Sequence, residues 1–240
     1  MIGGAVVLAL RGIARTPADE WSAGPGGPLI GPRVRAWYRG CMAPLEAGLA
    51  AAGVPPDALT WASLVASGCA GWAFAVGCVF LAGWLTILAG TLDILDGGLA
   101  RRSGRASRRG ALFDSVVDRW AEFLTFAGLG ALFLDEAWML GVVAVGAFAG
   151  QMVSYVRARA EGLGLTVAVG RAQRPERYVL LGFGAWISGL VAHLGCPLLG
   201  RQTHAVLRAA LIVLAAVGLW TAIERGRWAA AALRDRETRA

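Results

Sequence analysis

The sequence predicts an all-α integral membrane protein with six transmembrane helices, preceded by an amphipathic helix at the membrane interface. Apolar residues make up 57% of the 240 residues, and the mean hydropathy is +0.58. Such a composition is typical of membrane proteins. Two further observations support this class. The chain contains a series of apolar stretches long enough to span a bilayer, which takes roughly 20 residues each, and its arginines are unevenly distributed.

The N-terminal region predicts two different segments. Residues 1–32 are rich in proline and glycine, and we expect a flexible extension without regular structure. In residues 33–56, three arginines are set against Trp37 and Leu45, which predicts a helix lying in the membrane interface. A solvated helix is the alternative, and the aromatic pair Trp37 and Tyr38 favours the interface.

Two prolines, Pro55 and Pro56, break the chain before the first predicted span, and Asp57 or Thr60 is expected to cap the helix that follows. The six apolar stretches are about Leu59–Gly77, Val79–Leu99, Ala111–Phe133, Trp138–Val156, Tyr178–Leu194 and Ala205–Ile223. They fill most of the chain, so we expect one six-helix domain at 57–225.

Small residues at short helical separations occur inside these stretches, as in Gly68 with Gly71 and Gly146 with Gly150. In lipid, such glycines allow helices to approach closely. This spacing predicts close helix contacts, either within the bundle or at the seam of a dimer.

Arginine gathers in alternate connections, and this asymmetry predicts the orientation. The arginine-rich parts are the stretch before the first span, the links between spans two and three and between four and five, and a basic tail at 226–240. We therefore expect both termini to be cytoplasmic, with the protein integral to the cell membrane. The net charge of +7 then reflects topology and attraction to anionic lipid, and no nucleic-acid partner is expected.

Four aspartates lie at the ends of two neighbouring apolar stretches. Helical spacing puts Asp93 and Asp96 on one face, and Asp114 and Asp118 on one face of the next predicted helix. Carboxylates crowded at membrane depth are costly unless protons or cations neutralise them. Oxygen-only ligands favour hard divalent ions, so the pattern predicts a site for Mg²⁺ or Mn²⁺, and two such ions would bridge a pyrophosphate. A proton relay is the alternative.

The residues between these aspartates suit a nucleotide diphosphate. Gly97, Ala100 and Gly110 leave space beside the backbone, and Arg101 offers a bidentate phosphate donor, although it could also serve only as a cytoplasmic anchor. A small ion- or proton-coupled transporter would also carry acidic residues inside its helices. Carriers, however, interrupt their helices near the membrane midplane, whereas these aspartates lie beside an arginine-rich link.

The stretch from Asp93 to Asp118 reads D-x2-D-G-x2-A-R-x8-G-x3-D-x3-D, which resembles the signature of the CDP-alcohol phosphatidyltransferase family at every fixed position. In that family a CDP-linked lipid such as CDP-diacylglycerol donates its phosphatidyl group to an alcohol, and CMP leaves. The resemblance implies that the four aspartates are metal ligands, that Asp118 is also the general base on the acceptor hydroxyl, and that the protein is a homodimer. It further implies contacts to the CDP-lipid from Asp57, Thr60, Gly97, Arg101, Ser107 and Gly110.

The second half of the chain bears on the acceptor. Segments Ser154–Gly164 and Gln173–Arg177 resemble those of the bacterial phosphatidylinositol phosphate synthases, which implies that Arg157, Arg174 and Arg177 bind the phosphate of inositol phosphate. Guanidinium groups match phosphate oxygens well. The alternatives are a phosphatidylglycerophosphate synthase, whose acceptor glycerol 3-phosphate the same arginines would serve, and arginines that only set the membrane orientation.

Overall fold

The computed structural model describes residues 31–165, 174–193 and 204–239, so the predicted N-terminal extension lies almost entirely outside the described residues. Within these ranges the chain is helical and contains no strand, which confirms the predicted all-α class. The helices are α3 (Pro32–Ala51), α4 (Pro56–Ala75), α5 (Val79–Arg102), α6 (Arg108–Leu132), α7 (Ala137–Gly162), α8 (Arg174–His193) and α9 (Ala205–Arg239).

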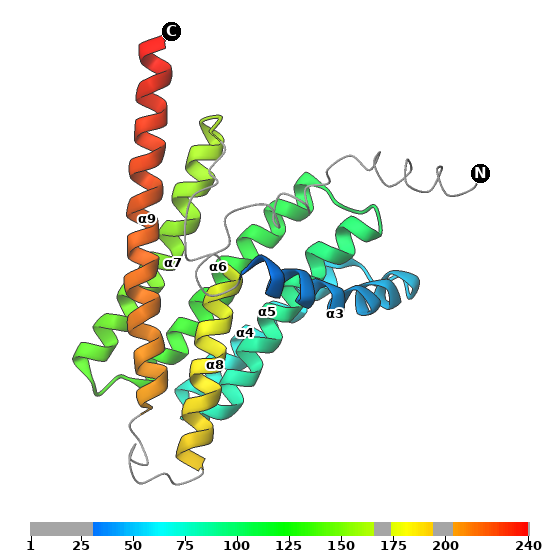
Figure 1. The fold of residues 1–240 in the computed structure, drawn as a ribbon. Coiled ribbons are helices and arrows are strands. Elements are labelled where there is room, and N and C mark those ends of the chain that lie inside the picture. Colours follow the sequence, from blue (N-terminus) through cyan, green and yellow to red (C-terminus); the bar gives the residue numbers. More distant parts are fainter. Residues whose placement is uncertain (1–30, 166–173, 194–203, 240) are drawn as a thin grey trace.

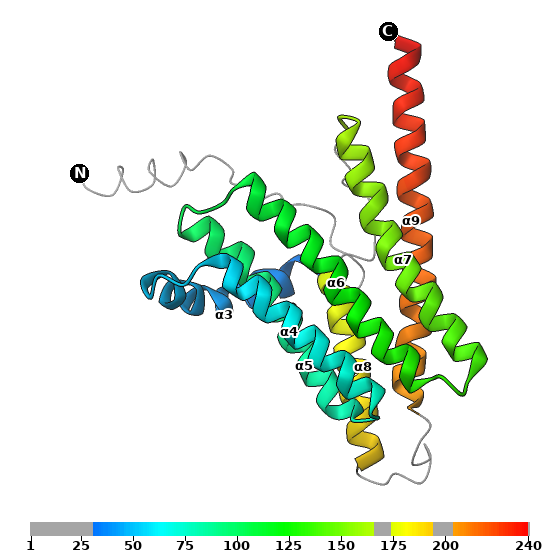
Figure 2. The same cartoon turned by 180° about the vertical axis from the view of Figure 1, so that it is seen from behind.

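Helices α4 to α9 form a closed ring in which each helix packs on two neighbours (Figures 1 and 2). The order around the ring is α4, α5, α8, α9, α7, α6 and back to α4. Helix α3 lies against α5 outside the ring, where Met42 and Leu49 pack with Leu95 and Leu99. Because the order in space differs from the order in the chain, side chains from α5, α6 and α8 can meet inside the ring.

The interior of the ring is apolar at one end and charged at the other. All six ring helices contribute to one apolar cluster, which includes Phe74, Ala82, Leu129, Val143, Leu181 and Leu211. The charged end comprises the last turns of α5 and the first turns of α6 and α8. The apolar cluster therefore holds the six helices together and sets the positions of the polar helix ends.

Helices α4 and α6 approach each other backbone to backbone. A Cβ atom built on Gly128 would overlap the backbone oxygen of Gly71, and one built on Gly71 would overlap the backbone oxygen of Leu124. Gly150 likewise faces Glu122 of α6. The glycine pairs predicted from the sequence thus make close contacts within the bundle.

We expect Gly128→Ala to destabilise the protein by about 1–3 kcal/mol or more, because overpacking against backbone cannot be relieved by a change of rotamer. Thermal unfolding of the purified protein in detergent, recorded at one scan rate, would measure this as a lower Tm. Gly141→Ala is the matched control, since Gly141 of α7 has open space within 4 Å and alanine favours the helix. Equal melting of the two variants would contradict the assigned contact.

The start of α4 differs from the prediction. The N-cap residue is Pro55, Pro56 is the first helical residue, and no side chain caps the helix, so the capping roles expected of Asp57 and Thr60 are wrong. The physical reason is that proline has no backbone N–H and is already fixed at a helical φ angle, which suits the first helical position.

Helix α9 continues well beyond the predicted sixth span. It runs to Arg239, and its residues Trp228 and Leu233 pack with Ala160 and Leu165 at the end of α7. The alanine-rich sequence of this segment favours the helix. The two helices remain side by side to the end of α7 in both views (Figures 1 and 2).

Four of the described helices, α4, α5, α7 and α9, are long and apolar enough to cross a membrane by length and composition. Helices α6 and α8 fall outside this group, and both carry ionised residues at the charged end of the ring. The apolar helices make the chain an integral membrane protein.

Candidate functional site

Three of the four aspartates meet at the charged end of the ring. Asp93 of α5 and Asp114 and Asp118 of α6 each offer a carboxylate oxygen, and these oxygens lie within 4.8 Å of one another. The four-residue spacing on α6 places its two aspartates on one helix face. Asp114 Oδ1 is buried and has no hydrogen-bond partner among the described residues. A buried carboxylate oxygen without a donor is costly, and a bound cation would compensate for it.

Asp96 lies one turn beyond Asp93 on α5 but outside this group of three. It is 5% exposed, and its Oδ2 accepts a hydrogen bond from Thr60 Oγ1 at 2.7 Å. The Thr60 hydroxyl therefore positions Asp96 instead of capping α4. Asp96 remains a predicted metal ligand, held at the edge of the cluster.

The donor set fits the predicted metal. It consists of carboxylate oxygens alone, which suits Mg²⁺ or Mn²⁺ better than zinc or copper. Asp93, Asp114 and Asp118 could hold such an ion, and within the described part of the chain Asp114 Oδ1 has no hydrogen bond that the ion would have to replace.

Arg174, the first residue of α8, reaches across the ring to this cluster. Its Nη1 lies 2.7 Å from Asp93 Oδ1 and also pairs with Asp118 Oδ2. Its Nη2 donates to the Tyr178 hydroxyl at 3.2 Å. Arg119 adds a second cation, with its Nη1 3.3 Å from Asp118 Oδ2. The sequence predicted phosphate binding by Arg174 but not its ion pairs with the candidate metal ligands.

The predicted CDP-lipid residues lie around the link between α5 and α6 and at the start of α4. Ser107 is the N-cap of α6, and its Oγ accepts a hydrogen bond from the backbone N–H of Gly110 at 3.0 Å. The Arg101 guanidinium lies over Gly97, where a Cβ would come within 3.3 Å of Nη1. Glycine thus leaves the space that the guanidinium needs.

Asp57, in the first turn of α4, connects this helix to the same link. Its Oδ2 lies 3.6 Å from Arg109 Nη1 at the start of α6, and both side chains are exposed. An exposed pair of this length contributes little to stability. Both side chains are therefore accessible to a ligand.

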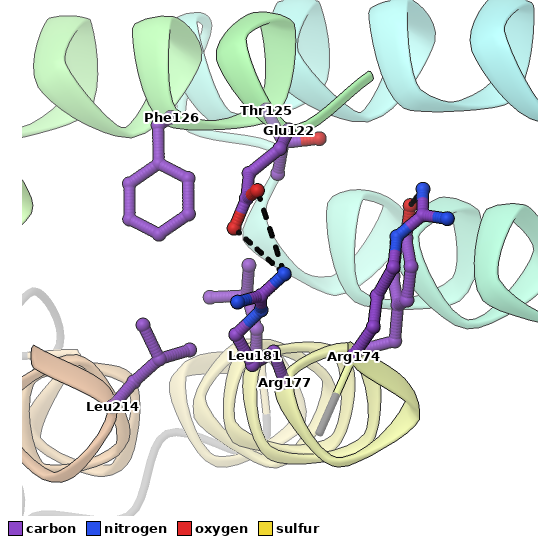
Figure 3. Close-up of a pocket in the computed structure, with 8 residues that line it drawn as sticks. Glu122, Thr125, Phe126, Arg174, Arg177, Leu181 and Leu214 are labelled. Atoms are coloured by element: carbon purple, nitrogen blue, oxygen red, sulfur yellow. Dashed lines mark hydrogen bonds and ion pairs between the residues drawn. The ribbon is translucent and has the colours of Figure 1, made fainter. Parts of the chain in front are cut away.

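Arg177 is part of a buried contact among three helices. Its Nη2 lies 3.4 Å from Glu122 Oε1 of α6, an ion pair that Figure 3 shows. Its Nη1 donates to the backbone oxygen of Gly150 in α7 at 3.2 Å. A Cβ on Gly150 would overlap the Glu122 carboxylate. Glu122 was not among the residues predicted from the sequence, although its position four residues after Asp118 places it on the same face of α6.

A cavity of about 30 Å³ adjoins this contact and is lined by residues including Thr125, Phe126 and Leu214. This volume admits a water molecule or two.

Two further arginines lie near Arg177. Arg157 of α7 is exposed and pairs with Glu161 at 2.8 Å. Arg225 of α9 is 7% exposed, and its Nη1 donates to the backbone oxygen of Val153 at 2.9 Å. Arg225 was not among the candidate site residues predicted from the sequence.

Comparison with known proteins gives consistent matches. A model of the CDP-alcohol phosphatidyltransferase family matches residues 54–231. The phosphatidylinositol phosphate synthase of Streptomyces avermitilis is 33% identical over 223 residues, covering 91% of this chain and 87% of the relative. The archaetidylinositol phosphate synthase of Methanothermobacter thermautotrophicus is 35% identical over 172 residues, covering 72% of this chain and 81% of the relative.

Solved structures of similar fold include the Mycobacterium tuberculosis phosphatidylinositol phosphate synthase with CDP-DAG bound. It superposes with a TM-score of 0.64 at 27% identity, covering 76% of this chain and 89% of that chain. The same synthase in complex with manganese and citrate superposes with a TM-score of 0.66, covering 78% of this chain and 87% of that chain. The similarity therefore extends through the ring of helices.

Proposed function

The chain belongs to the CDP-alcohol phosphatidyltransferase family, and on that premise we propose that it transfers a phosphatidyl group from CDP-diacylglycerol to inositol phosphate and releases CMP. One observation carries this proposal: carboxylates of α5 and α6 face arginines of α8 across the interior of the ring. Such an arrangement gives the site one part for metal and pyrophosphate and another for a second anion.

Asp93, Asp96, Asp114 and Asp118 are the proposed metal ligands. Mg²⁺ or Mn²⁺, in a pair of ions, would neutralise the pyrophosphate of the donor when bound. The proposed contacts to the donor lie at the open link between α5 and α6 and at the start of α4, and they are Asp57, Thr60, Gly97, Arg101, Ser107 and Gly110. The manganese complex of the tuberculosis synthase supports a divalent ion in this family.

Asp118 is the proposed general base. It would accept the proton of the acceptor hydroxyl, whose oxygen forms a bond to the phosphorus that carries the diacylglycerol. The phosphoanhydride bond to the cytidylate then breaks, and CMP leaves with the electron pair of that bond. Asp118 is buried at the cluster, so positioning within reach of the hydroxyl would provide its catalytic effect.

The acceptor assignment rests on the arginines. We propose that Arg157, Arg174 and Arg177 contact the acceptor phosphate, and that Glu122 holds Arg177 in place. The names of the two relatives differ in the lipid group, which is phosphatidyl in one and archaetidyl in the other, and both names contain inositol phosphate. This supports inositol phosphate over glycerol 3-phosphate, which is the second candidate.

The membrane placement follows from the outer faces of the helices. On α6 the exposed large residues include Leu112, Trp120 and Phe123, and on α8 they include Phe183 and Ile187. Asp118 and Glu122 of α6 pair with Arg174 and Arg177 of α8 inside the ring, so we propose that α6 and α8 also cross the membrane, giving six spans. We further propose that α3 lies in the interface, that the termini and active site are cytoplasmic, and that the protein is a homodimer. The proposed catalytic domain is 57–225, followed by a basic tail at 226–240.

The test is CMP release by the purified protein in detergent with CDP-diacylglycerol and Mg²⁺. The acceptor panel contains inositol phosphate, glycerol 3-phosphate, free inositol and serine. Release with inositol phosphate alone is expected. Release with glycerol 3-phosphate alone would retain the enzyme class and replace the acceptor. Folded protein that releases no CMP with any acceptor or metal would contradict the proposal and favour the transporter alternative, which requires no cytidine nucleotide.

A further inference from the structure

Arg174 and a divalent cation require the same oxygen atoms. The guanidinium pairs with Asp93 Oδ1 at 2.7 Å and with Asp118 Oδ2. Asp93 and Asp118 are two of the three residues whose oxygens could hold a metal ion together. A divalent ion binds its carboxylate oxygens at about 2.0–2.6 Å, and it repels a guanidinium held against those same oxygens.

We propose that Arg174 exchanges between two partners: it pairs with Asp93 and Asp118, and divalent-cation binding releases its guanidinium to the phosphate of the acceptor. This inference rests on the proposed function. Metal binding and acceptor binding are then coupled through one side chain, so each ligand strengthens the binding of the other. The cation then neutralises Asp93 and Asp118 in place of Arg174, and the acceptor phosphate neutralises the released guanidinium.

The surroundings of Arg174 allow this exchange without a movement of α8. Arg177, one turn along the helix, is anchored to Glu122 and to the backbone of Gly150. Tyr178 is fixed as well, since its ring packs so closely on α5 that a Cβ on Gly90 would lie 2.8 Å from its Cγ. The exchange therefore needs a change of rotamer in Arg174 alone.

Tyr178 provides a fixed surface beside the moving side chain. The Arg174 guanidinium carbon lies 5.4 Å from the centre of the Tyr178 ring, and Nη2 bonds to the hydroxyl at 3.2 Å. Contact with an aromatic face stabilises a cation without using a carboxylate. Arg174 can thus leave the aspartates and keep a favourable neighbour.

The first test measures Mn²⁺ affinity of the full-length protein in detergent, without substrates, from the electron paramagnetic resonance signal of free Mn²⁺. We expect Arg174→Ala to bind Mn²⁺ on the order of tenfold more tightly, within the usual range of coupling between two sites. An arginine with a merely structural role would leave the affinity unchanged or reduce it. Arg102→Ala is the matched control, because it removes an exposed arginine from the same end of α5 and is expected to change the affinity far less.

Removing Arg174 takes a positive charge away from the carboxylates of Asp93 and Asp118, so folding is checked by size-exclusion chromatography and by melting with saturating Mn²⁺. Arg174→Gln keeps hydrogen-bonding capacity without the charge and provides the same comparison if the alanine variant does not fold. Unchanged or weaker Mn²⁺ affinity in the folded variant would overturn the exchange.

The second test uses the wild-type protein and detects release directly. Phenylglyoxal modifies accessible arginines, and peptide mass spectrometry locates the adducts. We expect Mn²⁺ to accelerate modification of Arg174, while Arg177, still paired with Glu122, reacts at an unchanged rate. No acceleration at Arg174 would overturn the proposal. Neither test measures catalysis, so an active enzyme that fails them would refute the exchange alone, and an inactive protein that passes them would refute only the proposed function.

Discussion

Replacing Asp118 by asparagine is expected to lower the rate of CMP release by on the order of a thousandfold or more. The change removes the proposed base, and loss of general acid–base catalysis alone typically costs about a hundred- to ten-thousandfold. It also removes one of the oxygens that could hold a metal ion, so the two losses act together. The measurement is the initial rate of CMP release at saturating CDP-diacylglycerol, inositol phosphate and Mg²⁺.

Asp135→Asn is the matched control for this variant. It makes the same chemical change at an exposed residue in the connection between α6 and α7, and the rate should stay close to that of the wild type. Because removing a buried charge can alter stability, both variants need melting curves recorded with the activity. A folded Asp118→Asn protein that kept a substantial fraction of the wild-type rate would contradict both roles of Asp118.

Glu122→Ala is expected to destabilise the protein by about 3–5 kcal/mol, the usual cost of removing one partner from a buried ion pair. The side chains of Arg177 and Glu122 are only 9% and 12% exposed. Without the carboxylate, the Arg177 guanidinium would remain buried with the Gly150 oxygen as its described partner. The measurement is the Tm in detergent at a fixed scan rate, because membrane-protein unfolding is rarely reversible.

Glu161→Ala tests whether burial is the cause. Glu161 pairs with Arg157 at 2.8 Å, a shorter distance than that of the Glu122 pair. The side chains of Arg157 and Glu161 are, however, about half exposed, at 58% and 47%. Exposed pairs contribute about 0–1 kcal/mol, so little change in Tm is expected. Similar losses in the two variants would show that the Glu122 contact is not buried as described.

The aspartates illustrate which part of a site is readable from local spacing. Asp114 and Asp118 are four residues apart in one helix, so a common face follows from the helical repeat, and the structure brings both to Asp93 as predicted. The partners of the arginines were not readable in this way. Arg174 meets Asp93 across 81 positions of the chain, and Arg225 meets Val153 across 72.

The sequence by itself determined the helical class, the membrane character, the carboxylate pairs and the family. Each of these depends on composition or on spacing within one or two consecutive helices. Only the tertiary structure decided that α8 lies between α5 and α9 in the ring, and therefore that Arg174 meets the aspartates while Arg177 is buried on Glu122. The physical reason is that spacing within one helix predicts which residues share a face, whereas the partners of that face depend on which helices pack on either side.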